Sequence, residues 1–581
     1  MIISLNIISH HSYYFYETAT LVFMIIWYMK LYKTRSETTS FRLFLVGIIA
    51  LSFLPMLHLF TTTDLPHTSD GAMHLARIAS YFKEVMQGQF PIRWAGDLNY
   101  GYGTPIFNFF HPLPYMITTV MVAFGSSLTL SLKLSFLLSY LMSGIGMYVF
   151  AYSVWKNVKI AAFIAILYQF APFRLVDILV RGSLGGIYAY TLLPFVLFAV
   201  VRFIESRRYH YIWIISFCAA GLAMSHNIIG FVFFGLAFLF TLFYPSAPRL
   251  KILSLLSLMG GVGIAGFFVA PAILDHTYTY GYLLTKNLFY DHFAPFINFF
   301  IPNFINSPQL RIHEVSVQIG VVHLIGFVTS FFIVLKRKIY GKKDTVIASF
   351  CITVFLITLF FMQPISKLLW EHISILRQFQ YPWRLLSVIT FVSALAGFSI
   401  PRIVKSRFIV ACIGLFAICT TVYYWVPPQG YQTIHESDYW NYPLTTNYYG
   451  EVDTIWSEGP AKTYPKEKIE LIAGSATIET VKRTSIIHEY SVHATTNVTL
   501  LDNTQYFPGW NVLVNNQKTE IQFQDPNHRG LITFDVPAGN SSVRVEWKEN
   551  KTRLLADYLS IFSIIIVLTL PYIARKKLLQ L

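Results

Sequence analysis

Apolar runs about as long as a membrane is thick recur along this chain and constrain its fold most strongly. The run FRLFLVGIIALSFLPMLHLF at 41–60 is one example, and about 20 such residues in a helix cross the hydrocarbon core of a bilayer. Because 55% of the residues are hydrophobic and 13% are charged, the chain holds more apolar surface than a soluble domain can bury. We therefore predict a polytopic α-helical membrane protein.

The lengths of the runs predict about 13 transmembrane helices. Lys and Arg residues cluster between the runs, and with these spans every cluster falls on one side, which the positive-inside rule identifies as cytoplasmic. These loops account for the formal charge of +15, and no soluble segment has the basic face that a nucleic-acid partner requires. The predicted spans are 14–32, 41–60, 130–152, 159–173, 183–203, 210–226, 228–244, 252–270, 319–335, 344–361, 385–400, 408–426 and 554–574.

The run IFNFFHPLPYMITTVMVAFGS at 106–126 is treated differently. If it crossed the membrane, every later basic cluster would move to the other side. Its prolines, Pro112 and Pro114, and its aromatic residues favour a helix that lies in the outer interface of the bilayer. The segments predicted outside the cell are then the loops 61–129, 174–182, 271–318 and 362–384 and the segment 427–553.

The segment 427–553 alternates polar and apolar residues in runs such as GWNVLVNN, GLITFDVP and SVRVEWKE, separated by turn sequences. This pattern predicts a C-terminal extracytoplasmic β-sandwich domain. It follows a transmembrane domain at 1–426 and precedes the region 554–581, which holds the last helix and a basic cytoplasmic tail. We predict a multi-pass protein of the plasma (inner) membrane. All four cysteines lie in apolar runs, so the β domain relies on packing without disulfides.

Ionisable residues gather at the predicted outer ends of the spans. In HTSDGAMHLARI at 67–78, Asp70, His74 and Arg77 have spacings that place them on one face of a helix. A helix start capped by Ser69 or Asp70 explains the same pattern. A single arginine at a membrane exit is also explained by contact with lipid headgroups.

Further charged groups occur in APFRLVDILVRG (Arg174, Asp177, Arg181), in SHNI (His226) and in QFQYPWR (Arg384). These segments place acidic, basic and imidazole side chains on one side of the membrane. We therefore predict that they share a pocket.

Several motifs in this order resemble a known family. They are SDGAMHLARI, FPIRWAGDLNYGYGTPIFNFFHPLPY, APFRLVDILVRG, SHNI, QFQYPWR and YFPGWNVLV. Together they resemble bacterial membrane proteins described as "6-pyruvoyl-tetrahydropterin synthase-related", which are similar to YfhO-like proteins and belong to the GT-C glycosyltransferase superfamily. The resemblance covers roughly residues 40–575 and implies a GT-C-like transmembrane domain. It does not imply pterin chemistry, because no soluble segment carries the zinc-binding histidines of such a synthase.

The resemblance also implies roles for individual residues. GT-C enzymes carry a catalytic acid in the first external loop, which Asp70 matches, followed by an interfacial helix, which 106–126 matches. A second acid commonly lies in the next external turn, where Asp177 stands. Many relatives carry another acid shortly after the RG of that turn, whereas this chain reads Gly185-Gly186.

The implied function is transfer of a sugar from a polyprenyl-phosphate-linked donor to an extracytoplasmic acceptor, which is a cell-envelope glycan, a lipid or a protein. Asp70 is then the general base or, with His74 or His67, a ligand of a divalent metal such as Mg²⁺ or Mn²⁺, and Asp177 supports it. The other candidates bind substrate. They are Arg174, Arg181 and Arg384 on the donor phosphate, Arg77 and His226 beside them, and Tyr102, Trp94 and Trp383 on sugar rings.

Two alternatives remain open at this stage. A transporter of a lipid-linked saccharide predicts charged residues in the middles of spans and inverted repeats, and neither is evident in the sequence. A non-catalytic membrane scaffold with a degenerate pocket predicts that Asp70→Asn leaves the cellular phenotype unchanged.

Overall fold

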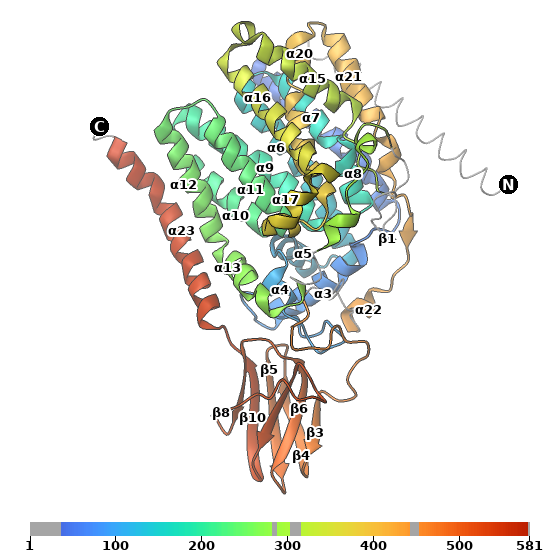
Figure 1. Ribbon diagram of the computed structural model, residues 1–581, viewed down its shortest axis with the longest axis vertical. Helices are drawn as coiled ribbons and strands as arrows, with labels where there is room; N and C mark the ends of the chain where they lie inside the picture. Colours follow the sequence, from blue (N-terminus) through green and yellow to red (C-terminus); the bar gives the residue numbers. More distant parts are fainter. Residues whose placement is uncertain (1–35, 282–286, 303–314, 442–451, 579–581) are drawn as a thin grey trace, which may run out of the picture.

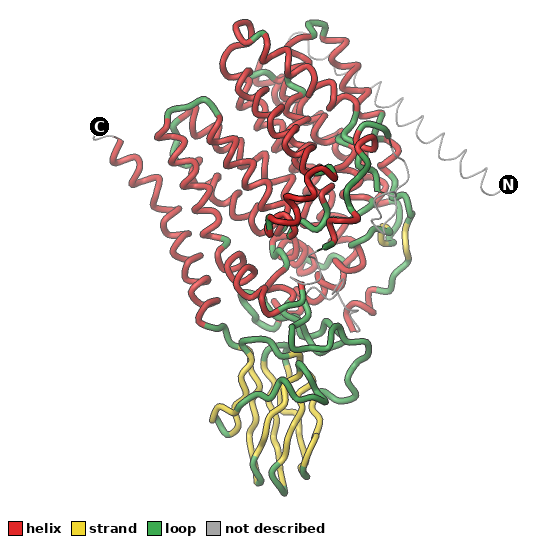
Figure 2. Tube along the Cα trace, viewed as in Figure 1, coloured by secondary structure: helices red, strands yellow, loops and turns green. Residues whose placement is uncertain are grey.

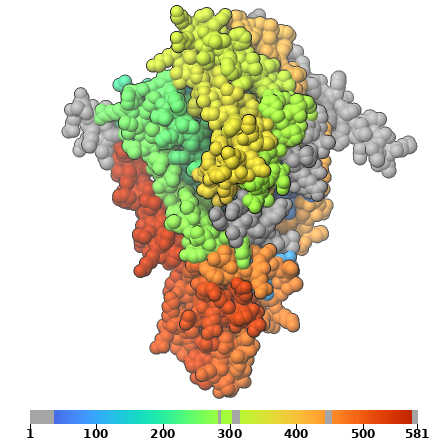
Figure 3. Space-filling view, in the orientation of Figure 1, coloured from blue at the N-terminus to red at the C-terminus, as the bar shows by residue number. Residues whose placement is uncertain are grey.

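The computed structural model describes residues 36–281, 287–302, 315–441 and 452–578. Figure 1 shows a tall helical part with a smaller β domain at one end, and Figure 2 separates the two by secondary structure. In the space-filling view of Figure 3 the β domain projects from the helical part, and the last helix runs along one edge of the molecule.

The helices of the described residues follow the apolar runs of the sequence. Up to residue 274 they are α2 (Glu37–Phe53), α3 (Gly71–Met86), α4 (Ile106–Phe109), α5 (Leu113–Ala123), α6 (Leu128–Trp155), α7 (Val158–Gln169), α8 (Pro172–Leu179), α9 (Leu184–Ser206), α10 (Tyr211–Ser225), α11 (Asn227–Phe243), α12 (Pro248–Ile264) and α13 (Gly266–Leu274). The later ones are α15 (Val321–Leu335), α16 (Arg337–Phe361), α17 (Lys367–His372), α18 (Ser374–Arg377), α19 (Leu386–Ala396), α20 (Ser399–Ile403), α21 (Arg407–Cys419), α22 (Glu436–Asn441) and α23 (Lys551–Leu578).

Six helical segments among the described residues are long and apolar enough to cross a membrane, or eight if each of two bent helix pairs is one span. This confirms a multi-pass membrane protein, with fewer candidate spans than the 13 predicted. The predicted span 14–32 lies outside the described residues. Four others, at 210–226, 228–244, 319–335 and 408–426, are helices of 13 to 17 residues, or about 20–26 Å at 1.5 Å per residue.

The predicted span 408–426 shows why a continuous apolar run can give a short helix. Its helix α21 ends at Cys419. The hydroxyl groups of Thr420 and Thr421 then donate hydrogen bonds to the carbonyls of Ala417 and Ile418. These side-chain bonds compete with continuation of the helix, and a 3₁₀ turn, η7 (Val422–Trp425), follows.

The run at 106–126 forms the short helices α4 and α5, with Pro112 at the start of α5. With 11 residues, α5 is about 16 Å long, which is too short to cross a bilayer of about 30 Å. Figure 1 shows α3, α4 and α5 at the end of the helical part that lies next to the β domain. Their position along the membrane normal stays a prediction.

The β domain consists of two antiparallel sheets with strand orders β4-β5-β10-β7-β8 and β3-β6-β9. Residues of both sheets, including Val492, Leu500, Phe534 and Val543, are buried in one apolar cluster. The sequence prediction of a β-rich region is confirmed, although its strands begin only at Ile469. The strands are β3 (Ile469–Ala473), β4 (Ala476–Arg483), β5 (Ile487–Ala494), β6 (Val498–Gln505), β7 (Trp510–Val514), β8 (Gln517–Thr519), β9 (Leu531–Val536) and β10 (Gly539–Trp547), and outside the domain β1 (Leu65–Pro66) pairs with β2 (Tyr431–Gln432).

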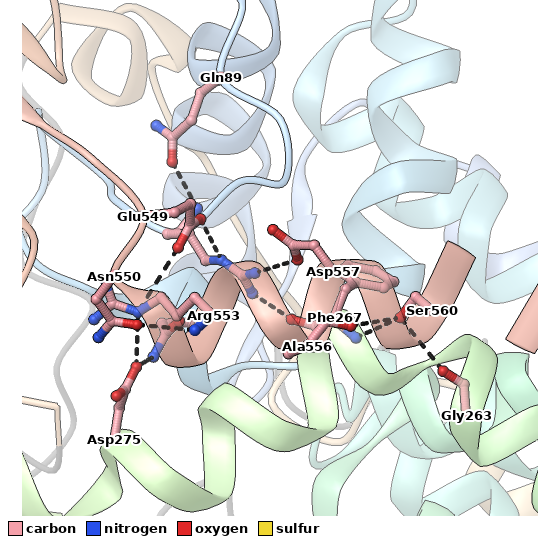
Figure 4. Close-up of polar contacts among 12 residues, drawn as sticks. Gln89, Gly263, Phe267, Asp275, Glu549, Asn550, Arg553, Ala556, Asp557 and Ser560 are labelled. Carbon is pink, nitrogen blue, oxygen red and sulfur yellow. Dashed lines mark hydrogen bonds and ion pairs between the residues drawn. The ribbon is translucent and has the colours of Figure 1, made fainter. Parts of the chain in front are cut away.

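A network of buried ion pairs joins the helical part to the end of the β domain (Figure 4). The Arg93 side chain is 1% exposed and donates to Glu549 (2.9 Å) and Asp557 (2.9 Å) on either side of the start of α23, and to the carbonyl of Phe267 on α13 (2.5 Å). Because a buried guanidinium needs both counter-charges and acceptors, Arg93 fixes the loop that follows α3 to the first turns of α23.

The second arginine of this network, Arg553, is completely buried at the start of α23. Its Nε donates to Asp275 (2.8 Å), which also accepts from the Asn108 side chain of α4 (3.0 Å). The aromatic rings of Phe507 and Trp547 cover its guanidinium at 5.1 and 4.8 Å. Helices α4, α13 and α23 therefore meet at one set of charges, next to the β domain.

The last turn of α3 makes a buried polar contact with the loop that follows the helix. Glu84 is completely buried, and its carboxyl accepts from the amide of Gln89 (3.0 Å) and the backbone N–H of Gly96 (3.0 Å). Burial raises the pKa of Glu84 to about 8, with a further contribution from the nearby Asp97. The folded protein therefore favours the protonated carboxyl.

We expect Arg93→Met to lower the free energy of unfolding by about 3 kcal/mol or more, because the change leaves two carboxylates and a carbonyl without their buried partner. Thermal unfolding of the detergent-purified protein measures this loss. The matched control is Arg208→Met in an exposed loop. Equal melting temperatures for the two variants would contradict the structural role of Arg93.

We expect Glu84 to make the protein less stable as the pH rises. The ordinary pKa of a glutamate carboxyl is 4.5, whereas the pKa of Glu84 in the folded protein is about 8. The contribution of the protonated Glu84 to the free energy of unfolding is complete below the ordinary pKa. It is lost as the pH rises through the pKa of Glu84 in the folded protein. Between about pH 5 and 8, the melting temperature should therefore fall more for the native chain than for Glu84→Gln, whereas the exposed Glu479→Gln should follow the native chain. Parallel curves for all three would show that Glu84 does not titrate in this range.

Candidate functional site

Backbone pairing brings the start of α3 against the turn after α8. The N–H of Ser69 donates to the carbonyl of Val180 (3.1 Å), and the N–H of Asp70 donates to the carbonyl of Arg181 (2.9 Å). Gly182 follows at a φ of +69°, and a Cβ at this position would overlap the Thr68 hydroxyl. Two acidic segments that are 107 residues apart in number, around Asp70 and Asp177, thus share one site.

Asp70 stands at the N-cap position of α3, but its side chain makes no capping hydrogen bond. The hydroxyl of Thr68 instead accepts from the N–H of Gly71 (3.1 Å), which satisfies one of the donors at the helix start. The simple capping explanation of the sequence pattern therefore does not account for Asp70, since its carboxylate is left available to other groups.

The charges of three arginines act on the Asp70 carboxylate. Burial raises the pKa of Asp70 above its ordinary value, while the charges of Arg181, Arg77 and Arg384 act in the opposite direction. The carboxyl is thus a stronger base than an exposed aspartate, in a region of positive charge.

Arg181 lies between the two acids. It forms an ion pair with Asp177 four residues earlier, and its charge also acts on Asp70. Its guanidinium lies over the indole of Trp383, with 5.0 Å from Cζ to the ring centre. One oxygen of Asp177, Oδ2, and the Nε of Arg181 are buried without a hydrogen-bond partner among the described residues.

Arg384 enters the site from η6 (Pro382–Leu385), just before α19. Its Nη1 donates to the side chain of Gln380 (2.7 Å) and to the carbonyl of Phe379 (3.2 Å). The ring of Tyr381 lies 4.6 Å from its Cζ and stacks on Trp383 at 5.3 Å. Within the described part of the chain its Nε has no acceptor, so this nitrogen can bind an anion.

A row of uncharged imidazoles forms the opposite wall of the site. His74 Nδ1 is 3.0 Å from the hydroxyl of Tyr115, His111 stacks on Tyr115, and His226 stacks on His111 at 5.1 Å. Burial, together with the charge of Arg77, lowers the pKa of His74 well below its ordinary value and that of His111 to about 3. The positive charge of the site at neutral pH therefore comes from its arginines.

Arg77 lies one helical turn beyond His74 on the same face of α3. Its guanidinium is 4.0 Å from the ring centre of Phe110. The spacing in the sequence thus places Asp70, His74 and Arg77 together, as predicted.

His111 and Tyr115 belong to this wall, and neither was given a role from the sequence alone. They lie four residues apart in the motif HPLPY, with His111 just before α5 and Tyr115 in its first turn. That spacing, within a motif already noted for its resemblance, is the signal that could have identified them.

The structure separates two of the candidates, Arg174 and Tyr102, from this group. The guanidinium of Arg174 donates to Gln169 (2.6 Å) and Ser143 (2.8 Å) and lies among the rings of Tyr140, Tyr168 and Tyr190. These contacts hold two of its nitrogens within the helical part, and its Nε has no hydrogen-bond partner among the described residues.

Tyr102 lies instead beside the β domain, where its carbonyl accepts from Gln505 (2.7 Å). Trp94, another candidate, packs against Trp510 and Trp547 of the β domain, and His67 is exposed.

The polar residues expected to share one pocket therefore form three separate groups in the structure. The cluster around Asp70 is one, the ion network of Arg93 and Asp275 is the second, and the contact region of Asp97 and Tyr102 with the β domain is the third. The prediction of one shared pocket included too many residues. Charges of opposite sign on neighbouring segments also pair locally, as Asp97 does with Lys83 (2.7 Å).

The donor set does not fit the predicted divalent metal. Across the described ranges, no three side chains of His, Cys, Asp or Glu come together as ligands. The charges that act on the Asp70 carboxyl are those of guanidinium groups, which can supply positive charge themselves.

Gly185 and Gly186 have a structural reason, because both positions lie against the site. A Cβ at Gly185 would overlap Nε2 of His111 and would lie 2.5 Å from the carbonyl of Ser225, and one at Gly186 would lie 3.0 Å from Asp177 Oδ2. A carboxylate side chain at either position would displace the imidazole or meet the existing acid.

The comparisons with known proteins agree with the resemblance seen in the sequence. The family model described as "6-pyruvoyl-tetrahydropterin synthase related domain; membrane protein" matches residues 107–427. An uncharacterised protein of Lactococcus lactis subsp. cremoris is 24% identical over 216 residues, which are 35% of this chain and 35% of that protein. The match thus spans about a third of this relative.

Parts of three solved structures are similar to this chain. The arabinofuranosyltransferase AftD from Mycobacteria is 14% identical, with 66% of this chain and 27% of AftD covered and a TM-score of 0.44. The Archaeoglobus fulgidus oligosaccharyltransferase without ligand is 15% identical over 70% of this chain and 57% of its own, with a TM-score of 0.38. The A. fulgidus oligosaccharyltransferase AglB, in complex with an inhibitory peptide and a dolichol-phosphate, is 14% identical over 68% and 56%, with a TM-score of 0.37.

We expect Gly185→Ala to lower the melting temperature by several degrees, because the new methyl group would overlap His111 and a backbone carbonyl. Gly235→Ala is the matched control, since nothing lies within 4 Å of a Cβ there and the residue is also in a helix. Its melting temperature should be unchanged or slightly higher. The close packing around His111 would be disproved if both variants melted together.

Proposed function

Because the chain belongs to the family of membrane proteins described as 6-pyruvoyl-tetrahydropterin synthase related, we propose from its site that it is a membrane glycosyltransferase. It transfers a sugar from a polyprenyl-phosphate-linked donor to a hydroxyl group of an acceptor in the cell envelope. The sequence resemblance to GT-C enzymes supports this proposal, and so does the chemistry of the site.

The observation that carries the proposal is the position of the Asp70 carboxylate. It is not used as a helix cap, its pKa is raised by burial, and three guanidinium groups act on it. A base beside fixed cations is what transfer from a phosphate ester requires, because a proton must leave the acceptor while negative charge grows on the phosphate.

In the proposed step, Asp70 accepts the proton of the acceptor hydroxyl. The hydroxyl oxygen forms a bond to the anomeric carbon of the sugar, and the bond from that carbon to the phosphate oxygen breaks. The electron pair of the broken bond stays on the phosphate oxygen. The lipid phosphate leaves with one more negative charge, which balances the proton held by Asp70.

Arg181 and Arg384 bind the leaving phosphate in this proposal. Each has a buried Nε without a protein acceptor in the described ranges, and guanidinium groups match phosphate oxygens in geometry. Asp177 is a positioning residue, because its ion pair holds Arg181 beside Asp70. The neutral imidazoles of His74 and His226 leave the arginines as the cations of the site. Arg174 has no part in this proposal.

The orientation is part of the proposal. Figure 1 shows the connection between α20 and α21 at the end of the helical part opposite the β domain, and this connection carries Lys405 and Ser406 between Arg402 and Arg407. By the positive-inside rule this end faces the cytoplasm. The site and the β domain then face the outside of the plasma membrane.

We expect Asp70→Asn to abolish transfer, because an amide cannot accept the proton. Glycolipids are profiled in a deletion strain rescued with the native gene, with Asp70→Asn or with Asp64→Asn, a partly buried aspartate in the same loop. The Asp70→Asn strain should resemble the deletion, with the lipid-linked donor accumulated and product reduced at least about 100-fold. The Asp64→Asn strain should resemble the native one.

The amount of protein in the membrane is measured in each strain, so that loss of product is not loss of the protein. Native glycolipid profiles in the Asp70→Asn strain would overturn the catalytic proposal and favour a non-catalytic scaffold.

A further inference from the structure

A polar cavity of about 240 Å³ lies between the β domain and the loop that follows α3. From the loop it is lined by residues that include Asp97 and Tyr102, and from the β domain by Lys468, Arg483 and His488. It also includes Gln87, which directly follows α3. The cavity is thus separate from the Asp70 cluster, which lies at the other end of the same helix.

The charges around this cavity are predominantly positive. Asp97 is held by Ser80 (2.6 Å) and Lys83 (2.7 Å). Asp502 is completely buried behind the wall of the cavity and is bonded to His488 (2.7 Å) and Arg483 (3.2 Å). Two glutamates nearby also have partners, since Glu84 accepts from Gly96 (3.0 Å) and Glu470 accepts from Asn503 (2.7 Å). These carboxylates are therefore already bonded within the protein.

Lys468 is the cation with spare donors. Its Nζ donates to the carbonyl of Gly101 (2.9 Å), which leaves two of its three N–H groups for another acceptor. Partial desolvation at the cavity wall, together with the positive charge of Arg483, lowers the pKa of Lys468, although Asp502 and Asp97 act in the opposite direction. An anion in the cavity would relieve the repulsion between the two cations.

The size of the cavity limits what can enter. Its volume corresponds to several water molecules at about 30 Å³ each, and it is smaller than the pockets of about 300–1,000 Å³ that enclose drug-sized ligands. One sugar or polyol unit with a single charged group fits these limits, and the hydroxyls of Tyr102 and Thr504 are further polar groups in the lining.

We propose that this cavity binds an anionic unit, carrying a carboxylate or a phosphate, of the envelope saccharide that serves as acceptor. This inference rests on the proposed function. Helix α3 has 16 residues and is about 24 Å long, so the cavity and Asp70 lie roughly this far apart. The acceptor is therefore an oligosaccharide or a longer polymer, held at one end of α3 and glycosylated at the other.

Isothermal titration calorimetry of the full chain in detergent tests the proposal. Three probes are compared: a galacturonate hexamer, which carries carboxylates, a glycerol-phosphate hexamer, which carries phosphates, and neutral maltohexaose. We expect at least one anionic probe to bind more tightly than maltohexaose, and the tighter of the two identifies the charged group. In Lys468→Gln the affinity for that probe should fall about 10-fold or more, because a charge-assisted hydrogen bond is lost.

Lys466→Gln is the matched control, since Lys466 is exposed, lies two residues earlier and does not line the cavity. It should bind like the native chain. The proposal is overturned if no anionic probe binds more tightly than maltohexaose, or if Lys468→Gln and Lys466→Gln bind equally well.

Asp70→Asn separates this inference from the proposed function. It should bind the probe as the native chain does, because Asp70 does not line the cavity. Selective anion binding by a native chain that makes no glycolipid product, or by an Asp70→Asn chain that still makes it, would support the cavity site and reject the transferase. Product formation without selective anion binding would reject the cavity site alone.

Discussion

The ion pair between Arg181 and Asp177, placed beside Asp70 by two backbone hydrogen bonds, is the interaction on which the proposed site depends. The ion pair lowers the cost of burying Arg181 and Asp177, and the charge of Arg181 also acts on Asp70. It also leaves the site with more cations than acids, because Arg77 and Arg384 approach the same carboxylate. An arrangement of this kind holds one acid ready to accept a proton and keeps positive charge for an anion.

Contacts elsewhere in the molecule hold the elements that carry this site in place. Helix α3 carries Asp70 at its first turn, and its far end contacts the loop that Arg93 fixes to α23. Through Arg553 and Asp275 the same junction holds α4, which lies just before His111 and Tyr115. The β domain and the imidazole wall are thus attached to one set of buried charges. A change at this junction would alter both the domain contact and the geometry around Asp70.

Local patterns in the sequence predicted those parts of the site that local structure determines. Two of these patterns are found in the structure, because helix geometry alone determines them. They are the spacing of Asp70, His74 and Arg77 and the i, i+4 pair of Asp177 and Arg181. The partners of Arg93 could not be predicted in this way, since Glu549 lies 456 residues later in the chain. Arg174 has the same spacing as its neighbours but meets tyrosines from other helices. Among the described residues, fewer segments are long enough to span the membrane than predicted, because composition does not show where a helix bends or ends.

The proposed function requires Asp70 to lie beside the binding site of a lipid-linked phosphate. A cryo-EM structure of the full chain with a long-chain polyprenyl phosphate tests this requirement. We expect phosphate density within hydrogen-bond distance of Arg181 and Arg384 and next to the Asp70 carboxylate, with the lipid tail leading away into the membrane. Phosphate density at any other place, with the Asp70 cluster unchanged, would contradict it.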